Sequence, residues 1–384
     1  MKVLLVDQIA KVNYKYSFSL AQALMALGQD VSMAIDQKKE AEGCLCPKYN
    51  WFKTDEKNIS KLAKAFNYLW SYEQIRRLVK REHYDVIHVQ WFQLSPLDYL
   101  YLKAIKCMRK VKLVVTVHDI LPFNERFYDK AFHGKIYALA DEIIVQADNN
   151  VQRFGELFPE HQHKVHCIPH GHFLDYADFC DKQEARSKLD IPEGKRVFLF
   201  FGQIKKVKGV GVLLESFARI CKEHPDYYLI IAGSVWKDDF SSYQEIIDRT
   251  GIADQVRLEI RYIDDSEIGS FYSAADICVL PYLDVYQSGV VQLCYAYKKP
   301  VIATDLAAFQ EVVLNGRSGL LCKVNDAEDL AAKMVELGQQ PEVFESMGAC
   351  GYQYIKETYS WDRIAEKVSM IYEASSKNSS KEDR

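Results

Sequence analysis

Short apolar runs alternate with helical stretches along this chain, and the whole alternation occurs twice. The runs with strand character lie at 1–6, 31–35, 85–89, 113–117 and 142–145, and again at 196–201, 228–232, 256–258, 277–280 and 301–303. Strands that alternate with helices predict a parallel sheet with helices on both faces. We therefore predict an α/β protein built from two doubly wound, Rossmann-like domains that face one another across a cleft.

A polar stretch at 173–192, which ends in a Pro-Glu-Gly turn, separates the two alternations. We predict an N-terminal domain at 1–172, a linker over the polar stretch, and a C-terminal domain at 193–358. The end of the chain is predicted to form an amphipathic helix at 359–373 and a disordered polar tail at 374–384. Ligands of doubly wound sheets bind beyond the carboxyl ends of the strands, so we expect the active site in the cleft.

Composition narrows the classes of function. The net charge of −4 argues against a general nucleic-acid binder, which is usually strongly basic. No apolar stretch reaches the length of about 18 residues that a membrane span needs, and the start lacks the apolar core of a signal peptide. We therefore expect a cytoplasmic protein. The ten cysteines include no Cys-x-x-Cys pair, which favours buried thiols in a reducing compartment over a zinc site.

The charge is divided unevenly between the halves. Residues 1–172 carry 24 basic and 19 acidic side chains, a balance of +5, and the remainder carries 25 and 34, a balance of −9. Within the basic half, the segment 61–81 has an apolar helical stripe that consists of Leu62, Phe66, Leu69, Tyr72 and Ile75. Its basic residues are Lys61, Lys64, Arg76, Arg77, Lys80 and Arg81. The segment is either a helix that packs on its own sheet or one that lies on an anionic membrane surface, at the inner face of the cell membrane.

Two loops of the second half could bind a phosphate group. In FFGQIKKVKG (200–209), a loop between a strand and a helix carries Lys205 and Lys208. Backbone amides at such a helix start favour an anion, and the lysines add cationic charge. In PYLDVYQSGV (281–290), Ser288 is a candidate N-cap and Gly289 permits close backbone approach. The alternatives are solvated lysines in the first loop and an ordinary capped helix in the second.

Polar residues also follow strands of the first half. His118 and Asp119 end the run at 113–117, where they could orient a sugar or assist proton transfer. Trp91 follows another strand and is either a platform for a sugar or part of the core. His170 belongs to an Ile-Pro-His-Gly turn that leads out of the first domain. A histidine that only closes a strand through hydrogen bonds is the plainer interpretation of His118.

The order and spacing of these motifs together resemble glycosyltransferase family four, the retaining nucleotide-sugar glycosyltransferases with the GT-B fold. The similarity covers nearly the whole chain and is strongest over 196–337. It includes Ala275-Asp276 before a strand that ends at Leu280-Pro281. In this resemblance the final helix would cross back to the N-terminal domain. The implied roles are binding of the donor diphosphate by Lys205, Lys208, Gln287, Ser288, Gly289 and Val290, catalysis by His118 with both lysines, nucleoside contacts from Tyr262, Ile263 and Glu311, and an acceptor side with Trp91, Asp119 and His170.

The chain also departs from the family pattern. The common pair of glutamates spaced eight apart would fall at Val285 and Leu293. A subgroup with a Gln-Ser-Gly-Val donor loop lacks these carboxylates as well. A glycine pair is missing from 8–16, and another is replaced by Ala307-Ala308. The frequent arginine after the donor-domain glycine is Gln203 here.

The resemblance implies transfer of a hexosyl group from a nucleoside diphosphate sugar, linked to UDP or GDP, with retention at the anomeric carbon. The acceptor would be a glycan or a lipid-linked sugar in surface polysaccharide synthesis. The leaving phosphate would help to remove the acceptor proton, and the two lysines would replace a metal ion, so no metal and no cofactor is expected. The alternative, favoured by the missing carboxylates and glycine pairs, is a catalytically silent GT-B partner or chaperone of another glycosyltransferase.

Overall fold

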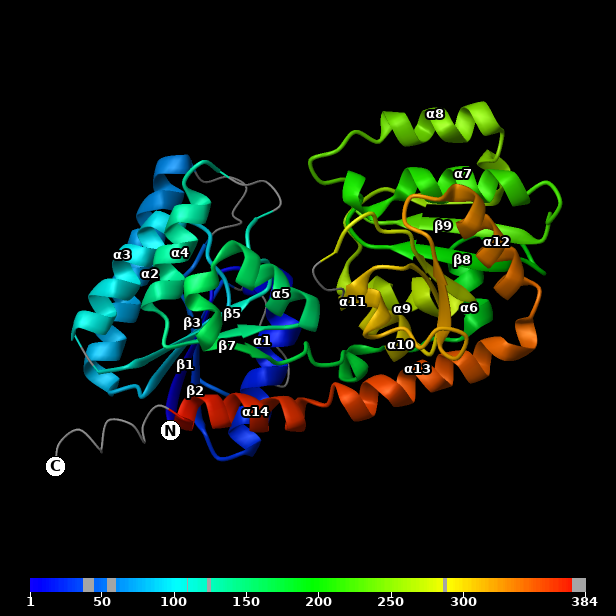
Figure 1. Cartoon of the computed structure of the whole chain (residues 1–384). Helices are drawn as coiled ribbons and strands as arrows, with labels where there is room; N and C mark the ends of the chain where they lie inside the picture. Colours follow the sequence, from blue (N-terminus) through cyan, green and yellow to red (C-terminus); the bar gives the residue numbers. More distant parts are fainter. Residues whose placement is uncertain (37–44, 54–59, 109, 123–125, 286–288, 375–384) are drawn as a thin grey trace. The chain divides into compact units, whose positions relative to one another are not determined.

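The polypeptide forms two compact units (Figure 1). The first consists of Met1–Gly171 together with the segment that begins at Tyr359, and the second of His172–Thr358. The computed structural model describes the following residues of the 384-residue chain: 1–36, 45–53, 60–108, 110–122, 126–285 and 289–374.

The first unit is built on a parallel sheet with the strand order β3-β2-β1-β4-β5-β6-β7. The strands are β1 (Lys2–Asp7), β2 (Asp30–Ile35), β3 (Lys48–Asn50), β4 (Val86–Val89), β5 (Lys112–Val117), β6 (Glu142–Val145) and β7 (Val165–Cys167). One face is covered by α1 (Ala10–Ala26) and α14 (Trp361–Ala374) (Figure 1). The helices of the other face are α2 (Lys61–Glu82), α3 (Ser95–Met108), α4 (Asp129–Leu139) and α5 (Asp148–Leu157).

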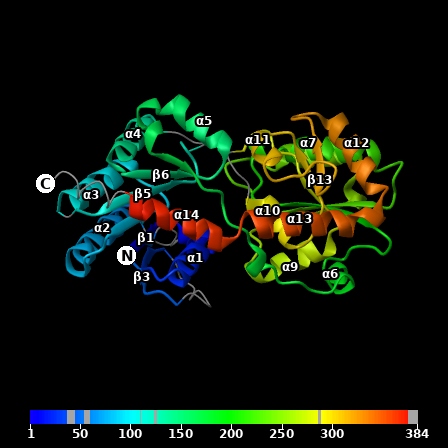
Figure 2. The same ribbon diagram turned by 60° about the horizontal axis from the view of Figure 1, so that its bottom comes forward.

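Helix α14 belongs to the first unit although it follows the whole second unit in the sequence. It lies beside α1 in both views (Figures 1 and 2). Its buried residues Ile364, Val368 and Ile371 recur at helical spacing and belong to one core cluster with Leu24 of α1 and Val114 of β5. Full burial of an aliphatic side chain of this size stabilises a fold by about 1.5–3 kcal/mol, so α14 is a substantial part of this core.

The second unit is built on a parallel sheet with the strand order β10-β9-β8-β11-β12-β13. The strands are β8 (Arg196–Phe201), β9 (Tyr227–Ala232), β10 (Val256–Glu259), β11 (Ile277–Leu280), β12 (Val301–Thr304) and β13 (Gly319–Cys322). One face is covered by α7 (Val210–Ile220), α8 (Ser241–Thr250) and α12 (Ala327–Gly338) (Figure 1). The remaining helices are α6 (Lys182–Lys188), α9 (Asp265–Ala274), α10 (Gly289–Ala296), α11 (Ala307–Gln310) and α13 (Phe344–Thr358).

The two parallel sheets confirm the predicted fold class. Each predicted strand is present, but the sequence pattern missed β3, β7 and β13. All three lie at an outer edge of their sheet. Strands buried on both faces have continuous apolar runs, whereas an edge strand is covered less and carries a weaker signal. Thus β3 and β7, each of three residues, are only partly buried or exposed.

The polar stretch at 173–192 lies in the second unit and includes helix α6. Ala185 of this helix is buried, and α6 packs against α9. A guanidinium nitrogen of Arg186 lies 2.8 Å from a carboxylate oxygen of Asp276, which in turn accepts a hydrogen bond from the backbone amide of Val197 at 2.7 Å. The stretch is therefore attached to the sheet by buried polar contacts.

The apolar stripe predicted along 61–81 is divided between two environments. Tyr72 and Ile75 of α2 are buried, each with 1% exposure. Leu62 is 85% exposed and Phe66 71% exposed. The prediction of one stripe is therefore wrong, because Tyr72 and Ile75 lie on the buried side of α2 with Tyr68, whereas Leu62 and Phe66 lie on its exposed side.

Candidate functional site

Three loops meet at the carboxyl edge of the sheet in the second unit. They follow β8, β9 and β11, and glycines allow them to touch through their backbones. Gly209 has φ +68°, and a Cβ atom there would lie 1.8 Å from the carbonyl oxygen of Pro281. Gly233 has φ +149°, and a Cβ atom there would lie 1.9 Å from the carbonyl oxygen of Gly202. Any side chain at either position would therefore separate the loops.

The loop after β8 carries the two candidate lysines. Lys205 and Lys208 are both half-buried, whereas Lys206 between them is exposed. The amide of Leu283 donates a hydrogen bond to the carbonyl of Val207 at 2.8 Å, which joins this loop to the one after β11. The ammonium nitrogen of Lys208 lies 3.7 Å from the ring centroid of Tyr282. The loop contacts thus hold Lys208 at a defined place on the sheet edge.

The start of α10 lies beside the same loops. A Cβ atom at Gly202 would lie 3.8 Å from a methyl carbon of Val290, and one at Gly289 would lie 3.1 Å from the ring of Phe173. The first amides of a helix have no partner within it, and the helix dipole favours negative charge at this end. Gly289 and Val290 therefore begin a helix next to the lysine loop. The predicted phosphate-binding residues Gln287 and Ser288 lie outside the described residues.

The predicted nucleoside-binding residues lie at the same edge of the sheet, on either side of β8. Tyr262 and Ile263 follow the outer strand β10; Tyr262 is 64% exposed and Ile263 is buried. Glu311 follows α11, beyond β12, and its carbonyl accepts a hydrogen bond from the hydroxyl of Tyr354 at 3.0 Å. In the strand order, β10 and β12 each lie two positions away from β8. Two inter-strand spacings amount to about 10 Å. A ligand of nucleotide size could bridge these distances.

The candidate residues of the first unit surround one buried tyrosine. The ring of Tyr16 lies 5.0 Å from that of His118 and 4.8 Å from that of His170. The rings of Trp91 and His118 are 5.5 Å apart. The structure therefore brings His118, His170 and Trp91 together at the carboxyl edge. Asp119, the next residue after His118, is half-buried.

Burial keeps the histidines of this cluster neutral. Loss of solvent, with a smaller effect from the neighbouring His170, lowers the pKa of His118 to about 3. Burial also lowers the pKa of His170 to about 4. At neutral pH each ring therefore has one donor and one acceptor nitrogen. Neutral His118 is suited to hydrogen bonding with a sugar and poorly suited to protonating one.

Sequence reasoning missed several polar residues beside His118. Among the described residues, both side-chain amide atoms of Gln90 are buried without a hydrogen-bond partner. The side chain of Gln146 interacts with His118 and with the hydroxyl of Tyr16. The pairing of Val117 with Val145 puts Gln146 on the strand position next to His118. Each glutamine directly follows a strand, at the edge where ligands of such sheets bind. That position after a strand is the signal that the sequence offers for them, although neither glutamine belongs to a recognisable motif.

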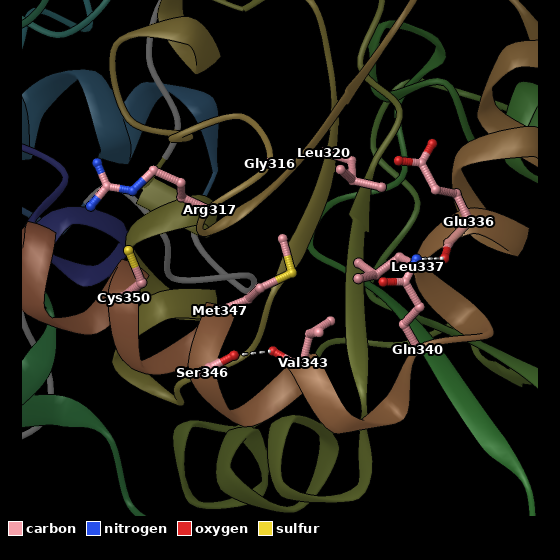
Figure 3. Close-up of a pocket in the computed structure, with 10 residues that line it drawn as sticks. All are labelled: Gly316, Arg317, Leu320, Glu336, Leu337, Gln340, Val343, Ser346, Met347 and Cys350. Atoms are coloured by element: carbon pink, nitrogen blue, oxygen red, sulfur yellow. Dashed lines mark hydrogen bonds between the residues drawn. The ribbon is translucent and has the colours of Figure 1, made fainter.

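A separate cavity of about 410 Å³ lies elsewhere in the second unit (Figure 3). Gly316 and Arg317 precede β13, and Met347 belongs to α13, so the cavity lies at the amino ends of the strands. Two of its polar groups are already engaged: Gln340 donates to the carbonyl of Glu336 at 2.9 Å, and Ser346 to that of Val343 at 2.9 Å. The cavity is therefore distinct from the candidate site at the carboxyl edge.

Neither a metal site nor a membrane-spanning helix is present in the described part of the chain. Within it, no group of three or more His, Cys, Asp or Glu side chains is placed to hold a metal ion. No helix of the described residues combines the length and apolar character of a membrane span.

Two doubly wound parallel sheets, each with candidate residues at its carboxyl edge, form the architecture of the GT-B fold. Comparison with models of protein families identifies the family of the chain. The model of Glycosyltransferase Family 4 matches residues 15–175, and the model of Glycosyl transferases group 1 matches residues 181–354. Together the two matches span both units. The chain belongs to the glycosyltransferases of group 1 and family 4. It is thus a glycosyltransferase whose sugar comes from a nucleotide sugar.

Curated relatives are similar over most of the chain. Spore coat protein SA of Bacillus subtilis is 24% identical over 327 residues, which are 78% of this chain and 81% of the relative. A D-inositol 3-phosphate glycosyltransferase of Corynebacterium urealyticum is 24% identical over 315 residues, or 76% of this chain and 72% of the relative.

Solved structures share the fold at low sequence identity. Sucrose-phosphate synthase from Thermosynechococcus elongatus superposes with a TM-score of 0.76 at 20% identity, covering 97% of this chain and 98% of that one. HepE from Anabaena, solved in complex with UDP-glucose, superposes with a TM-score of 0.74 at 15% identity, covering 97% of this chain and 100% of that one.

Proposed function

We propose that this chain transfers a hexosyl group from a UDP- or GDP-linked sugar to a glycan or lipid-linked acceptor, with retention at the anomeric carbon, in surface polysaccharide synthesis. The observation that carries the proposal is the placement of Lys208 where the loops after β8 and β11 meet, near the start of α10. A cationic side chain and free helix amides at one sheet edge suit a diphosphate. The UDP-glucose bound to the similar fold of HepE agrees with this ligand class.

In the proposed reaction the protein mainly positions the reactants and stabilises charge. The bond from the anomeric carbon to the diphosphate breaks, and negative charge grows on the leaving phosphate, where Lys205 and Lys208 would neutralise it. The acceptor oxygen attacks from the same face, and the leaving phosphate takes its proton. By the family resemblance, the common pair of glutamates would fall at Val285 and Leu293, so no protein nucleophile is assigned there. In this scheme the lysines take the place of a metal ion.

Lys208→Ala tests the donor site, with Lys206→Ala as the matched control on the same loop. We expect Lys208→Ala to lower kcat by about 10²–10³, the usual effect of removing one preorganised charge-stabilising donor. Lys206 is exposed, and its loss should leave the rate within about twofold, as expected for a residue outside the reaction. Release of nucleoside diphosphate from a panel of nucleotide sugars measures the rate, and circular dichroism checks folding. Full activity in folded Lys208→Ala would exclude the proposed donor site.

The remaining site residues are proposed by position. Tyr262, Ile263 and Glu311 would contact the nucleoside, and neutral His118 would bind a hydroxyl of the donor sugar. Trp91, Asp119 and His170 belong to the proposed acceptor side. The unpartnered buried amide of Gln90 near this cluster supports a role in binding polar groups, because buried polar atoms are nearly always partnered.

A catalytically silent partner of another glycosyltransferase is the second candidate. The observation that favours it is the absence of carboxylates at Val285 and Leu293. A thermal-shift panel of nucleoside diphosphates and nucleotide sugars separates the two functions. A ligand at a hundred times its Kd raises the stability of the folded state by about 2.7 kcal/mol. Stabilisation together with turnover supports the enzyme, whereas silence across the panel supports the partner.

We also propose that the first turns of α2 touch the inner face of an anionic membrane. Leu62, Phe66, Leu69 and Trp70 are 85%, 71%, 37% and 42% exposed on one side of the helix. The next turns of that side carry the exposed residues Arg77, which is paired with Glu73 at 2.9 Å, and Lys80. Apolar and cationic side chains on one helical face suit the boundary between acyl chains and anionic headgroups. The opposite side is anchored, since the hydroxyl of Tyr68 donates to Asp98 at 2.6 Å.

Vesicle flotation tests this contact. The wild-type chain should float with vesicles that contain phosphatidylglycerol, and less so at high salt, because the attraction to the headgroups is screened. The double variant Leu62→Ser, Phe66→Ser should lose most of this binding. Leu100→Ser is the control, because Leu100 is 57% exposed on α3. Absence of binding, or equal binding by the double variant, would refute the contact.

A further inference from the structure

The contact between Lys208 and Tyr282 joins a loop lysine to a buried aromatic ring. Tyr282 follows β11 and is 1% exposed. The ammonium nitrogen of Lys208 lies 3.7 Å from the centroid of its ring, well within the range of a cation–π interaction. Lys208 is itself half-buried. Partial loss of solvent around the cation strengthens its attraction to the negative face of the ring.

The ring of Tyr282 is fixed from several directions. The hydroxyl of Thr304 donates to the Tyr282 carbonyl at 2.8 Å, which ties the residue to β12. The next amide, of Leu283, donates to the carbonyl of Val207 at 2.8 Å. The Tyr282 ring also packs against that of Phe309, with the centroids 5.3 Å apart. The ring is therefore a rigid surface on which a flexible lysine side chain can rest.

We propose that Tyr282 is a positioning residue that holds the ammonium group of Lys208 ready for the diphosphate of a nucleotide. The inference rests on the proposed function and adds to it the ring that fixes the position of the Lys208 ammonium group. A phosphate oxygen can accept from an N–H donor of the ammonium group while the ring contacts the same cation from one side. A free lysine side chain loses considerable rotamer entropy when it binds. The ring removes part of that loss before the ligand arrives, which raises affinity by preorganisation.

Titration calorimetry with UDP and with GDP measures the effect in the full chain. We expect Tyr282→Leu to weaken binding of the nucleoside diphosphate by about tenfold, within the range of a partly desolvated cation–π contact. The conservative variant Tyr282→Phe keeps the ring and should restore the affinity. Tyr272→Leu is the matched control, because Tyr272 is also a buried tyrosine of this unit, stacked on Tyr297 at 4.8 Å. Because Tyr272 also lies near Tyr282 and Cys294 of α10, a second control is Tyr227→Leu, at a buried tyrosine on the amino end of β9 that is stacked on His224 at 4.5 Å. This second variant should lower the thermal stability and leave the Kd unchanged.

A double-mutant cycle separates positioning from a purely structural role. In the Lys208→Ala background, Tyr282→Leu should weaken binding no further, because the ring has no cation left to hold. An equal loss in both backgrounds would show that the ring acts through the fold, and would overturn the inference. If Tyr282→Leu does not fold, phenylalanine and fluorinated phenylalanine at position 282 provide the same comparison. Fluorine weakens the negative face of the ring while nearly keeping its shape.

The cycle also distinguishes failure of this inference from failure of the proposed function. If the wild-type chain binds neither UDP nor GDP, the proposed donor site is wrong. If Lys208→Ala weakens binding but the fluorinated and unfluorinated rings bind equally well, the donor site stands and the role of Tyr282 is refuted. Weaker binding with the fluorinated ring, absent in the Lys208→Ala background, is the result that the positioning role requires.

Discussion

Two glycines of the second unit have nearly the same backbone conformation but different surroundings. Gly209 has φ +68° and Gly251 has φ +70°. A Cβ atom at Gly251 would meet nothing within 4 Å, whereas one at Gly209 would lie 1.8 Å from the Pro281 carbonyl oxygen. The left-handed conformation alone disfavours a side chain by about 1–2 kcal/mol. Comparing substitutions at Gly209 and Gly251 therefore separates the cost of the left-handed backbone conformation from the cost of disturbing the close approach of the two candidate loops.

We predict that Gly251→Ala lowers the free energy of unfolding by about 1–2 kcal/mol. Gly209→Ala should lower it by about 1–3 kcal/mol more, because the loop after β11 must move. It should also abolish binding of nucleoside diphosphate, which Gly251→Ala should preserve. Urea denaturation and calorimetry measure the two effects. Equal losses of stability in both variants, with binding intact, would contradict the importance of this loop contact.

At the scale of elements, α14 is attached to the first sheet by polar contacts as well as by its apolar stripe. The hydroxyl of Tyr372 lies 2.7 Å from Nδ1 of His88 on β4, and Nε2 of His88 lies 2.7 Å from the hydroxyl of Thr116 on β5. Lys112 of β5 also donates to the carbonyl of Tyr372 at 3.3 Å. Burial lowers the pKa of His88 to about 3. The contact between helix and sheet therefore uses a neutral imidazole.

This burial makes stability depend on pH. The unfolded chain protonates His88 near its ordinary pKa of about 6.5, but the folded chain does not until about pH 3. The stability linked to His88 is therefore complete above the unfolded pKa and is lost as the pH falls toward 3. Between these values we predict that His88→Gln has a pH slope of unfolding free energy that is smaller by about 1.4 kcal/mol per pH unit.

Urea denaturation at pH 6, 5 and 4 measures the slope in both proteins. Asp7 acts in the opposite sense, because burial raises its pKa to about 6. It is present in both proteins, so the difference between their slopes isolates His88. Identical slopes would mean that His88 becomes protonated within the folded state.

At the scale of the whole molecule, the proposed chemistry needs no metal ion. Lys205 and Lys208 are expected to neutralise the diphosphate, which a divalent cation does in many phosphate sites. We predict that excess EDTA leaves the initial rate within about twofold of that of the untreated enzyme. Added Mg²⁺ or Mn²⁺ should raise the initial rate by no more than about twofold. Initial-rate assays with one nucleotide sugar test this. A loss that Mg²⁺ restores would show that the lysines are insufficient.

The sequence by itself determined the architecture and most of the candidate loops. Continuous apolar runs are a local signal of strands buried on both faces, so the alternation at 196–201 and onward predicts the sheet of the second unit. The parallel sheet then puts every loop after a strand at one edge. For that reason the positions of Lys205, Lys208 and His118 after strands are enough to make them candidates for the site.

Only the tertiary structure decided which of these residues touch. Tyr282 and Lys208 lie on loops of different strands, and His88 and Tyr372 are separated by 284 positions. It also divided α2 into an exposed and a buried part, although Leu62 and Ile75 have the same apolar character. Hydrophobic periodicity records how a segment folds locally. Partners across a parallel sheet depend instead on the order in which its strands lie side by side, and no local pattern in this sequence contains that order.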